Sequence, residues 1–197
     1  MKTGITGGIG SGKSYVCRLL AERGITVYDC DSAAKRLMRT SHELRQQLTS
    51  LIGPDTYLPT NHTTGQGEWQ LNKAAVAQFL LASEANAQAV DAIVHPAVFH
   101  DFEESGLQWM ESAILFESGI NRLVDRVVVV TAPEEVRIHR IMQRDGISRE
   151  KAKEWMSRQW PQEEVRRRAD FEIINDSVAD LNQQIDIFIH SIEKESY

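Results

Sequence analysis

The sequence has 197 residues, a formal net charge of −6, 42% hydrophobic residues and 25% charged residues, values typical of a globular protein of about one domain. The acidic balance argues against a general nucleic-acid-binding protein, and no apolar run approaches the roughly 20 residues of a membrane span. Predicted structure begins almost at Met1, which leaves no room for a signal peptide, and the two cysteines have neither metal-ligand nor disulfide spacing. We therefore expect a cytoplasmic protein with no nucleic-acid or membrane partner.

The first predicted elements flank a glycine-rich loop. Residues 2–6 form a short stretch that predicts a buried strand, and residues 14–23 carry apolar side chains at helical spacing. Between them, residues 7–14 read GGIGSGKS and fill the pattern G-x-x-x-x-G-K-[ST]. A strand, this loop and a helix in that order predict a phosphate-binding loop.

The chemistry of the loop indicates a nucleoside triphosphate as ligand. Glycines let backbone N–H groups surround phosphate oxygens, and the start of the following helix adds the positive end of its dipole. Lys13 is expected to reach the terminal phosphates, and the Ser14 hydroxyl is expected to bind Mg²⁺. The loop alone does not distinguish hydrolysis, phosphoryl transfer and nucleotide sensing.

Two aspartates follow the second predicted strand. Residues 25–28 predict that strand, which leads through Asp29-Cys30-Asp31 into a predicted helix over residues 32–51. In an extended segment, residues two apart point to the same side. One carboxylate could then hold the metal through water while the other accepts the proton of an acceptor hydroxyl. Either aspartate could instead cap the helix that follows.

The stretch over residues 32–108 has no clear strand, which predicts a helical insertion. After a polar loop over residues 53–69, Asn72 is a plausible N-cap of the next helix. A further helix is expected to end at His95, because Pro96 should break or restart it. The His95-Pro96 pair could mark the end of an acceptor-binding helix, or it could be a helix break with a surface histidine.

The second half of the chain alternates strands and helices. Residues 112–116 predict a third strand that ends at Glu117, which could belong to the site or be a solvated acid at a strand end. The later elements are expected to be a strand over residues 126–131, helices opened by Pro133 and Ser148, a strand over residues 171–174 and a helix over residues 181–192.

This order of elements predicts an α/β fold of the P-loop NTPase class, with a parallel sheet and helices on both faces. Ligands of such sheets bind beyond the carboxyl ends of the strands, so Asp29, Asp31 and Glu117 should share one rim with the loop. We expect three parts. They are a nucleotide-binding core of residues 1–31, 109–136 and 165–197, a helical acceptor-binding insertion of residues 32–108, and a small helical lid of residues 137–164.

Positive charge is concentrated in one stretch of this acidic chain. Residues 137–168 hold eight arginines and two lysines against five acidic residues. Arginine suits bidentate contacts with phosphates, and Arg140 and Arg144 lie four residues apart on one helical face. A closing lid could bring these cations to a phosphoryl group in transfer. Alternatively, they cover a solvated face.

Six segments of the chain resemble, in order, the dephospho-coenzyme A kinase family. They are the loop TGGIGSGKS, the strand and helix GITVYDCDSAAKRLM, the short segments HPAV and ILFESG, the lid helix RIMQRDGIS and the late segment ADFEIIND. Many nucleotide-binding proteins share the loop, whereas the ordered set is far more specific and covers nearly the whole chain.

The resemblance implies ATP-dependent phosphorylation of the ribose 3′-hydroxyl of dephospho-coenzyme A, the last step of coenzyme A synthesis. It implies Asp31 as the catalytic base, with Lys13 and Arg140 at the reacting phosphates, and Asn175 near the adenine. We assign Asp29, with Ser14, to the Mg²⁺ ion. The expected ATP-binding residues are Gly8, Gly10, Ser11, Gly12, Lys13, Ser14, Tyr15, Arg144 and Asn175. The expected acceptor-binding residues are Asp31, His95, Pro96 and Glu117.

Three other functions are compatible with the loop. A kinase for a nucleoside monophosphate or another small hydroxyl acceptor would use the same chemistry. A GTP-binding switch usually carries an N-K-x-D element, whereas the segment Asn72-Lys73-Ala74-Ala75 lacks the aspartate. A catalytically inactive binding module would keep the loop without transfer. The sequence indicates no oligomeric state.

Overall fold

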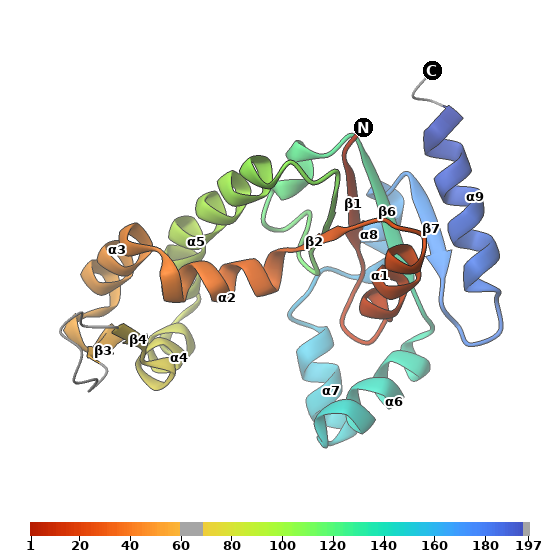
Figure 1. Cartoon of the computed structure of the whole chain (residues 1–197). Coiled ribbons are helices and arrows are strands. Elements are labelled where there is room, and N and C mark those ends of the chain that lie inside the picture. The colour runs from red at the N-terminus through yellow and green to blue at the C-terminus, as the bar shows by residue number, and fades with distance from the viewer. Residues whose placement is uncertain (60–68, 195–197) are drawn as a thin grey trace. The chain divides into compact units, whose positions relative to one another are not determined.

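The computed structural model describes residues 1–59 and 69–194, so most of the polar loop expected over residues 53–69 lies outside the described residues. The chain divides into two compact units. One unit comprises Met1–Asp29 and Gly106–Tyr197, and the other comprises Cys30–Ser105 (Figure 1). No helix among the described residues combines the length and the apolar character needed to cross a membrane.

The first unit is built on a five-stranded parallel sheet, as the alternation of elements predicts. The strand order is β2-β5-β1-β6-β7, so the strand that precedes the glycine-rich loop is central. All four residues of that strand are buried. The strands are β1 (Thr3–Thr6), β2 (Val27–Asp29), β5 (Trp109–Glu111), β6 (Arg126–Thr131) and β7 (Phe171–Ile174).

Helices flank this sheet and bury apolar side chains against it (Figure 1). Ile5 and Val128 of the sheet share a core with Val16 of the first helix and Ile185 of the last. Removing such side chains from water is the main favourable contribution to folding. The helices are α1 (Lys13–Glu22), the 3₁₀ turn η2 (Ile120–Leu123), α6 (Glu134–Asp145), α7 (Arg149–Met156), α8 (Gln162–Arg168) and α9 (Leu181–Lys194).

Helix ends follow local chemistry. Helix α6 ends at Gly146, which has a left-handed conformation with φ 65° and donates its N–H to the carbonyl oxygen of Met142. Helix α7 is capped by the Ser148 hydroxyl, which accepts from Lys151 N–H at 3.2 Å. Helix α1 differs, because its N-cap is Gly12 and no side chain caps it. The first N–H groups of α1 therefore lack a side-chain cap.

The second unit is mainly helical and is organised around the long helix α5 (Glu84–Ser105), which packs along the other three helices. Its core includes Leu44, Leu48, Val94 and Phe102. The remaining elements are α2 (Cys30–Thr40), α3 (His42–Ile52), the 3₁₀ turn η1 (Pro54–Thr56), β3 (Tyr57–Pro59), β4 (Trp69–Leu71) and α4 (Lys73–Ala82).

Three expectations for this unit are wrong. The helix predicted over residues 32–51 is two helices, because Ser41 interrupts it and caps α3 by accepting from Leu44 N–H. Pro96 does not break α5, since packing against three helices outweighs the cost of about 3 kcal/mol of an internal proline. The insertion also contains strands, because β3 and β4 form an antiparallel hairpin.

One expectation for the first unit also fails. The third strand lies at Trp109–Glu111 and not over residues 112–116, which form turns. Its position is set by pairing with β1, where Trp109 lies opposite Thr3. In addition, the arginine run at 166–168 ends a helix, α8, that the residue pattern did not indicate.

Candidate active site

The loop between β1 and α1 has backbone geometry that requires glycine. Gly12 has a φ of +97°, and a Cβ atom there would lie 2.0 Å from Nδ2 of Asn175. Gly7 has a φ of +144°, and a Cβ atom there would lie 2.3 Å from the carbonyl oxygen of Val130. Both positions combine a conformation unfavourable for other residues with close neighbours, so the loop can curl with its N–H groups inward.

We expect Gly12→Ala to destabilise the protein and to weaken ATP binding about tenfold, because the methyl group displaces Asn175 and strains the loop, a loss of about 1.4 kcal/mol. The measurements are thermal unfolding and ATP titration. Gly24→Ala is the matched control, since Gly24 also has a positive φ, of +78°, but a Cβ atom there meets nothing within 4 Å. Equal behaviour of the two variants would contradict the proposed close contact with Asn175.

Lys13 lies at the start of α1 and points back over the loop. Its Nζ donates to the carbonyl oxygen of Gly7 at 2.7 Å and lies 3.7 Å from Oε1 of Glu111. Burial lowers the pKa of Lys13, and the carboxylate of Glu111 opposes this shift. The ammonium is thus held at the loop by one carbonyl and one carboxylate.

Two carboxylates lie at the carboxyl ends of neighbouring strands. Asp29 ends β2 and Glu111 ends β5, and the two residues are direct partners in the register. Glu111 was not expected at the site, because the third strand was predicted to begin one residue after it. The acid that directly follows the apolar pair Trp109-Met110 was the signal that could have identified it.

These residues suit a hard divalent cation with few protein ligands. The Ser14 hydroxyl lies in the first turn of the uncapped helix α1, and Asp29 supplies a carboxylate at the same end of the sheet. Among the described residues, no three side chains of His, Cys, Asp or Glu gather to hold a metal ion by themselves. A hydroxyl, a carboxylate and phosphate oxygens match the oxygen-rich, partly hydrated coordination that Mg²⁺ prefers.

The other side of the loop is held by Arg140 and Asn175. Arg140 Nη1 donates to the carbonyl oxygens of Gly10 at 3.4 Å and Ser11 at 3.3 Å, and its Nη2 donates to Oδ1 of Asn175 at 3.3 Å. Asn175 Nδ2 donates to the carbonyl oxygen of Ser11 at 2.8 Å, and this side chain is buried. Residues separated by more than 120 positions in sequence thus meet at the glycine-rich loop.

Two neighbouring hollows share Gly12 and Arg140. One, of about 430 Å³, is also lined by Lys13, Ser14 and Arg144. The other is also lined by Tyr15 and Asn175, among other residues. The predicted ATP-binding residues other than Gly8 and Ser11 therefore line one of two neighbouring hollows, one with the lysine and one with the asparagine.

The comparison with known families decides what this arrangement is. A family model described as dephospho-CoA kinase matches residues 1–180. The chain belongs to the dephospho-coenzyme A kinase family. The final step of coenzyme A biosynthesis is the reaction of this family, whose members bind a nucleotide and a second substrate and use ATP with a divalent metal.

Curated members of the family are similar over most of their length. A dephospho-CoA kinase of Bacteroides fragilis is 39% identical over 196 residues, covering 94% of this chain and 89% of the relative. One of Porphyromonas gingivalis is 44% identical over 179 residues, covering 87% and 84%. A crystal structure of a Thermus thermophilus protein superposes with a TM-score of 0.80 at 30% identity, covering 97% of this chain and 96% of that one.

More distant structures share the fold. A dephospho-CoA kinase from Campylobacter jejuni has a TM-score of 0.65 at 24% identity, and the alignment covers both chains completely. A shikimate kinase from Acinetobacter baumannii has a TM-score of 0.55 at 14% identity, covering 99% of this chain and 93% of that one. These likenesses confirm the P-loop kinase fold class.

Other residues expected of a dephospho-coenzyme A kinase site lie as follows. Arg144 lines the hollow with Lys13, but its guanidinium also pairs with Asp145 at 2.7 Å. Glu117 lies within a turn instead of at the end of a strand, and its Oε1 accepts from Trp160 N–H at 3.1 Å. In this structure Glu117 therefore fixes the connection between α7 and α8.

In the helical unit, Asp31 lies in the first turn of α2 and pairs with Lys35. The expectation of an extended Asp29-Cys30-Asp31 segment is wrong, because α2 begins at Cys30. His95 lies within α5, 3.6 Å from Oδ1 of Asp91, and its ring stacks on Phe99. Its neighbour Pro96 lies in the same uninterrupted helix.

Gln159 is a site residue that the sequence did not indicate. Its Oε1 accepts from Ile9 N–H at 2.7 Å, and its Nε2 donates to the carbonyl oxygen of Ala113 at 3.4 Å. It also lines the hollow with Lys13. The glutamine oxygen thus accepts a hydrogen bond from a loop N–H group, and groups of this kind bind phosphate oxygens in phosphate-binding loops.

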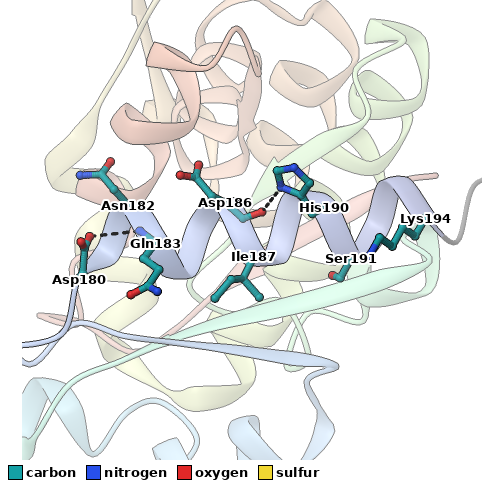
Figure 2. A pocket seen from close by; sticks show the side chains of 8 residues that line it. All are labelled: Asp180, Asn182, Gln183, Asp186, Ile187, His190, Ser191 and Lys194. Carbon is teal, nitrogen blue, oxygen red and sulfur yellow. Dashed lines mark hydrogen bonds between the residues drawn. The ribbon is translucent and has the colours of Figure 1, made fainter.

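A separate hollow lies along the outer face of α9, and Figure 2 shows the eight side chains that line it. Seven of them belong to this one helix and Asp180 directly precedes it. Asp186 is also engaged with Arg23 at 2.7 Å. None of the predicted site residues lines this surface.

Proposed function

We propose that the protein transfers the γ-phosphoryl group of ATP to the ribose 3′-hydroxyl of dephospho-coenzyme A, which yields coenzyme A and ADP. The observation that carries this proposal is the convergence of Lys13, Arg140 and Asn175 on the glycine-rich loop of a dephospho-coenzyme A kinase family member. Phosphoryl transfer depends mainly on positioning and on stabilisation of negative charge, which such a convergence supplies.

In this proposal the loop N–H groups and Lys13 bind the β- and γ-phosphates, and Asn175 lies near the adenine. The Ser14 hydroxyl would hold Mg²⁺ directly and Asp29 would hold it through water. The ion would neutralise charge on the β- and γ-phosphate oxygens. Arg140 would stabilise the charge that develops on the phosphoryl group in transfer.

Asp31 is the proposed base. It accepts the proton of the ribose 3′-hydroxyl as that oxygen forms a bond to the γ-phosphorus, while the bond from this phosphorus to the β–γ bridging oxygen breaks and ADP leaves. His95, Pro96 and Glu117 are proposed to bind the acceptor. Residues 137–164, which include α7 and all but the first three residues of α6, are proposed to act as a lid that excludes water.

The test is ADP release in a coupled assay with ATP, Mg²⁺ and one of three acceptors: dephospho-coenzyme A, AMP or pantetheine phosphate. We expect release with dephospho-coenzyme A alone and a product phosphorylated on the ribose 3′-oxygen. Release with AMP but not with dephospho-coenzyme A would indicate a nucleoside monophosphate kinase. If no ADP is released with any of the three acceptors although ATP binds, the protein would be a binding module.

A further inference from the structure

Arg137 is a buried arginine in the first turn of α6, and the mechanism above gives it no task. Only 7% of the residue is exposed. Its Nε donates to the carbonyl oxygen of Ile9 in the glycine-rich loop at 2.9 Å. Within residues 1–59 and 69–194, its two terminal nitrogens have no hydrogen-bond acceptor and no carboxylate lies within ion-pair distance.

A buried cation without a carboxylate partner is unfavourable. Burial lowers the pKa of Arg137, and Glu134 only partly opposes this. Buried charges in folded proteins are usually paired or bound to a ligand of opposite charge. The terminal nitrogens of Arg137 are not among the fully buried side-chain atoms without a partner, so they remain within reach of an anion from outside the chain.

The position of Arg137 indicates which anion this is. A Cβ atom on Gly8 would lie 2.2 Å from Nη2 of Arg137, so the guanidinium packs directly against the loop backbone. Arg137 and Arg140, one helical turn apart, bond to the carbonyl oxygens of three successive loop residues, Ile9, Gly10 and Ser11. Arg137 and Arg140 bond to loop carbonyls and therefore do not occupy loop N–H groups, although Gln159 accepts from the N–H of Ile9 and Gly8 accepts from that of Ser11.

We propose that Arg137 is a positioning residue of the nucleotide site, a buried cation that fixes the Ile9 carbonyl and whose charge is compensated by the polyphosphate of ATP. This inference rests on the proposed function, since it requires a polyphosphate at the loop. The positive charge of Arg137 also acts on Lys13 and contributes to the lowered pKa of the lysine. Arg137 would therefore act through the loop and its electrostatic potential, without contacting the reacting atoms.

The experiment compares Arg137→Met with the wild-type protein by isothermal titration with Mg-ATP and Mg-ADP, without acceptor, and by thermal unfolding with and without nucleotide. Methionine keeps much of the arginine's length and removes its charge. We expect nucleotide binding about 10- to 100-fold weaker, a range typical for the loss of a charge-assisted contact. The unfolding temperature without nucleotide should be unchanged or higher, because an uncompensated buried charge is removed.

A second variant separates charge from hydrogen bonding. Arg137→Gln keeps a donor for the Ile9 carbonyl but has no charge, so its nucleotide affinity should be as low as that of Arg137→Met. Arg23→Met is the matched control, because Arg23 carries the same charge but is paired with Asp186. It should bind nucleotide within about twofold of wild type, since the pair is exposed and screened.

Two results would overturn the inference. One is a lower unfolding temperature of Arg137→Met with unchanged nucleotide affinity, which would indicate packing alone. The other is wild-type affinity of Arg137→Gln, which would indicate that the charge has no role. Neither depends on the acceptor. A wild-type protein that binds ATP but does not phosphorylate dephospho-coenzyme A would refute the proposed function and leave this inference standing.

Discussion

Replacing Asp31 with alanine is expected to lower turnover of dephospho-coenzyme A about 10²–10⁴-fold, as for the loss of a general base. ATP binding should remain nearly intact, because the proposed nucleotide contacts come from the glycine-rich loop, Arg140 and Asn175. The side chain of Asp31 is exposed and pairs with Lys35 on the same helix, so its removal should leave the fold unchanged. Steady-state kinetics and ATP titration measure the two effects separately.

Lys35→Ala provides the matched control for this prediction. It breaks the same ion pair but keeps the Asp31 carboxylate, so it should retain turnover within a few fold. Loss of turnover in both variants would indicate that the ion pair shapes the start of α2. Wild-type turnover of Asp31→Ala would remove this residue from the mechanism and leave the base unassigned.

Replacing Lys13 with alanine is expected to reduce both ATP affinity and turnover. The turnover should fall about 10²–10³-fold, a loss typical for one electrostatic donor at a transition state. The ammonium is the proposed bridge between the reacting phosphates, and it also neutralises Glu111 at 3.7 Å. Without it, the ammonium would no longer offset the negative charge of Glu111 near the phosphates, so weaker binding should accompany the slower reaction.

The double variant Lys13→Ala with Glu111→Gln distinguishes these two causes. If the double variant recovers ATP affinity, repulsion by Glu111 caused the weaker binding of Lys13→Ala. If the affinity stays low, the lost contact between Lys13 and the phosphates caused the weaker binding. An active Lys13→Ala enzyme with unchanged ATP affinity would contradict the assignment of Lys13 to the phosphates.

The sequence predicted best what local chemistry determines. The glycine-rich loop follows from spacing alone, and the caps at Asn72 and Ser148 follow from side chains that bond to N–H groups three residues ahead. The strand over residues 126–131 is apolar enough to be identified without its neighbours. In each case the information lies within a few residues.

Features set by distant contacts were not predictable. The third strand lies at Trp109–Glu111 because it pairs with β1 and β2, so its carboxyl end carries Glu111 and not Glu117. Gln159 reaches Ile9 across 150 residues of sequence. In the sequence, nothing distinguishes Arg137 from the solvated arginines near it. Only the packing of α6 on the loop buries it.

The close packing of α6 on the loop also constrains how this sequence can diverge. An alanine at position 8 would collide with the guanidinium of Arg137 at 2.2 Å, and one at position 12 would collide with Asn175 at 2.0 Å. A shorter side chain at 137 would remove the first obstacle and leave the second in place. In a combinatorial library, alanine at position 8 should be tolerated where the flexible end of the side chain at 137 shifts or is shorter, whereas alanine at position 12 also has to adopt a φ of +97°, so position 8 should vary more freely than position 12.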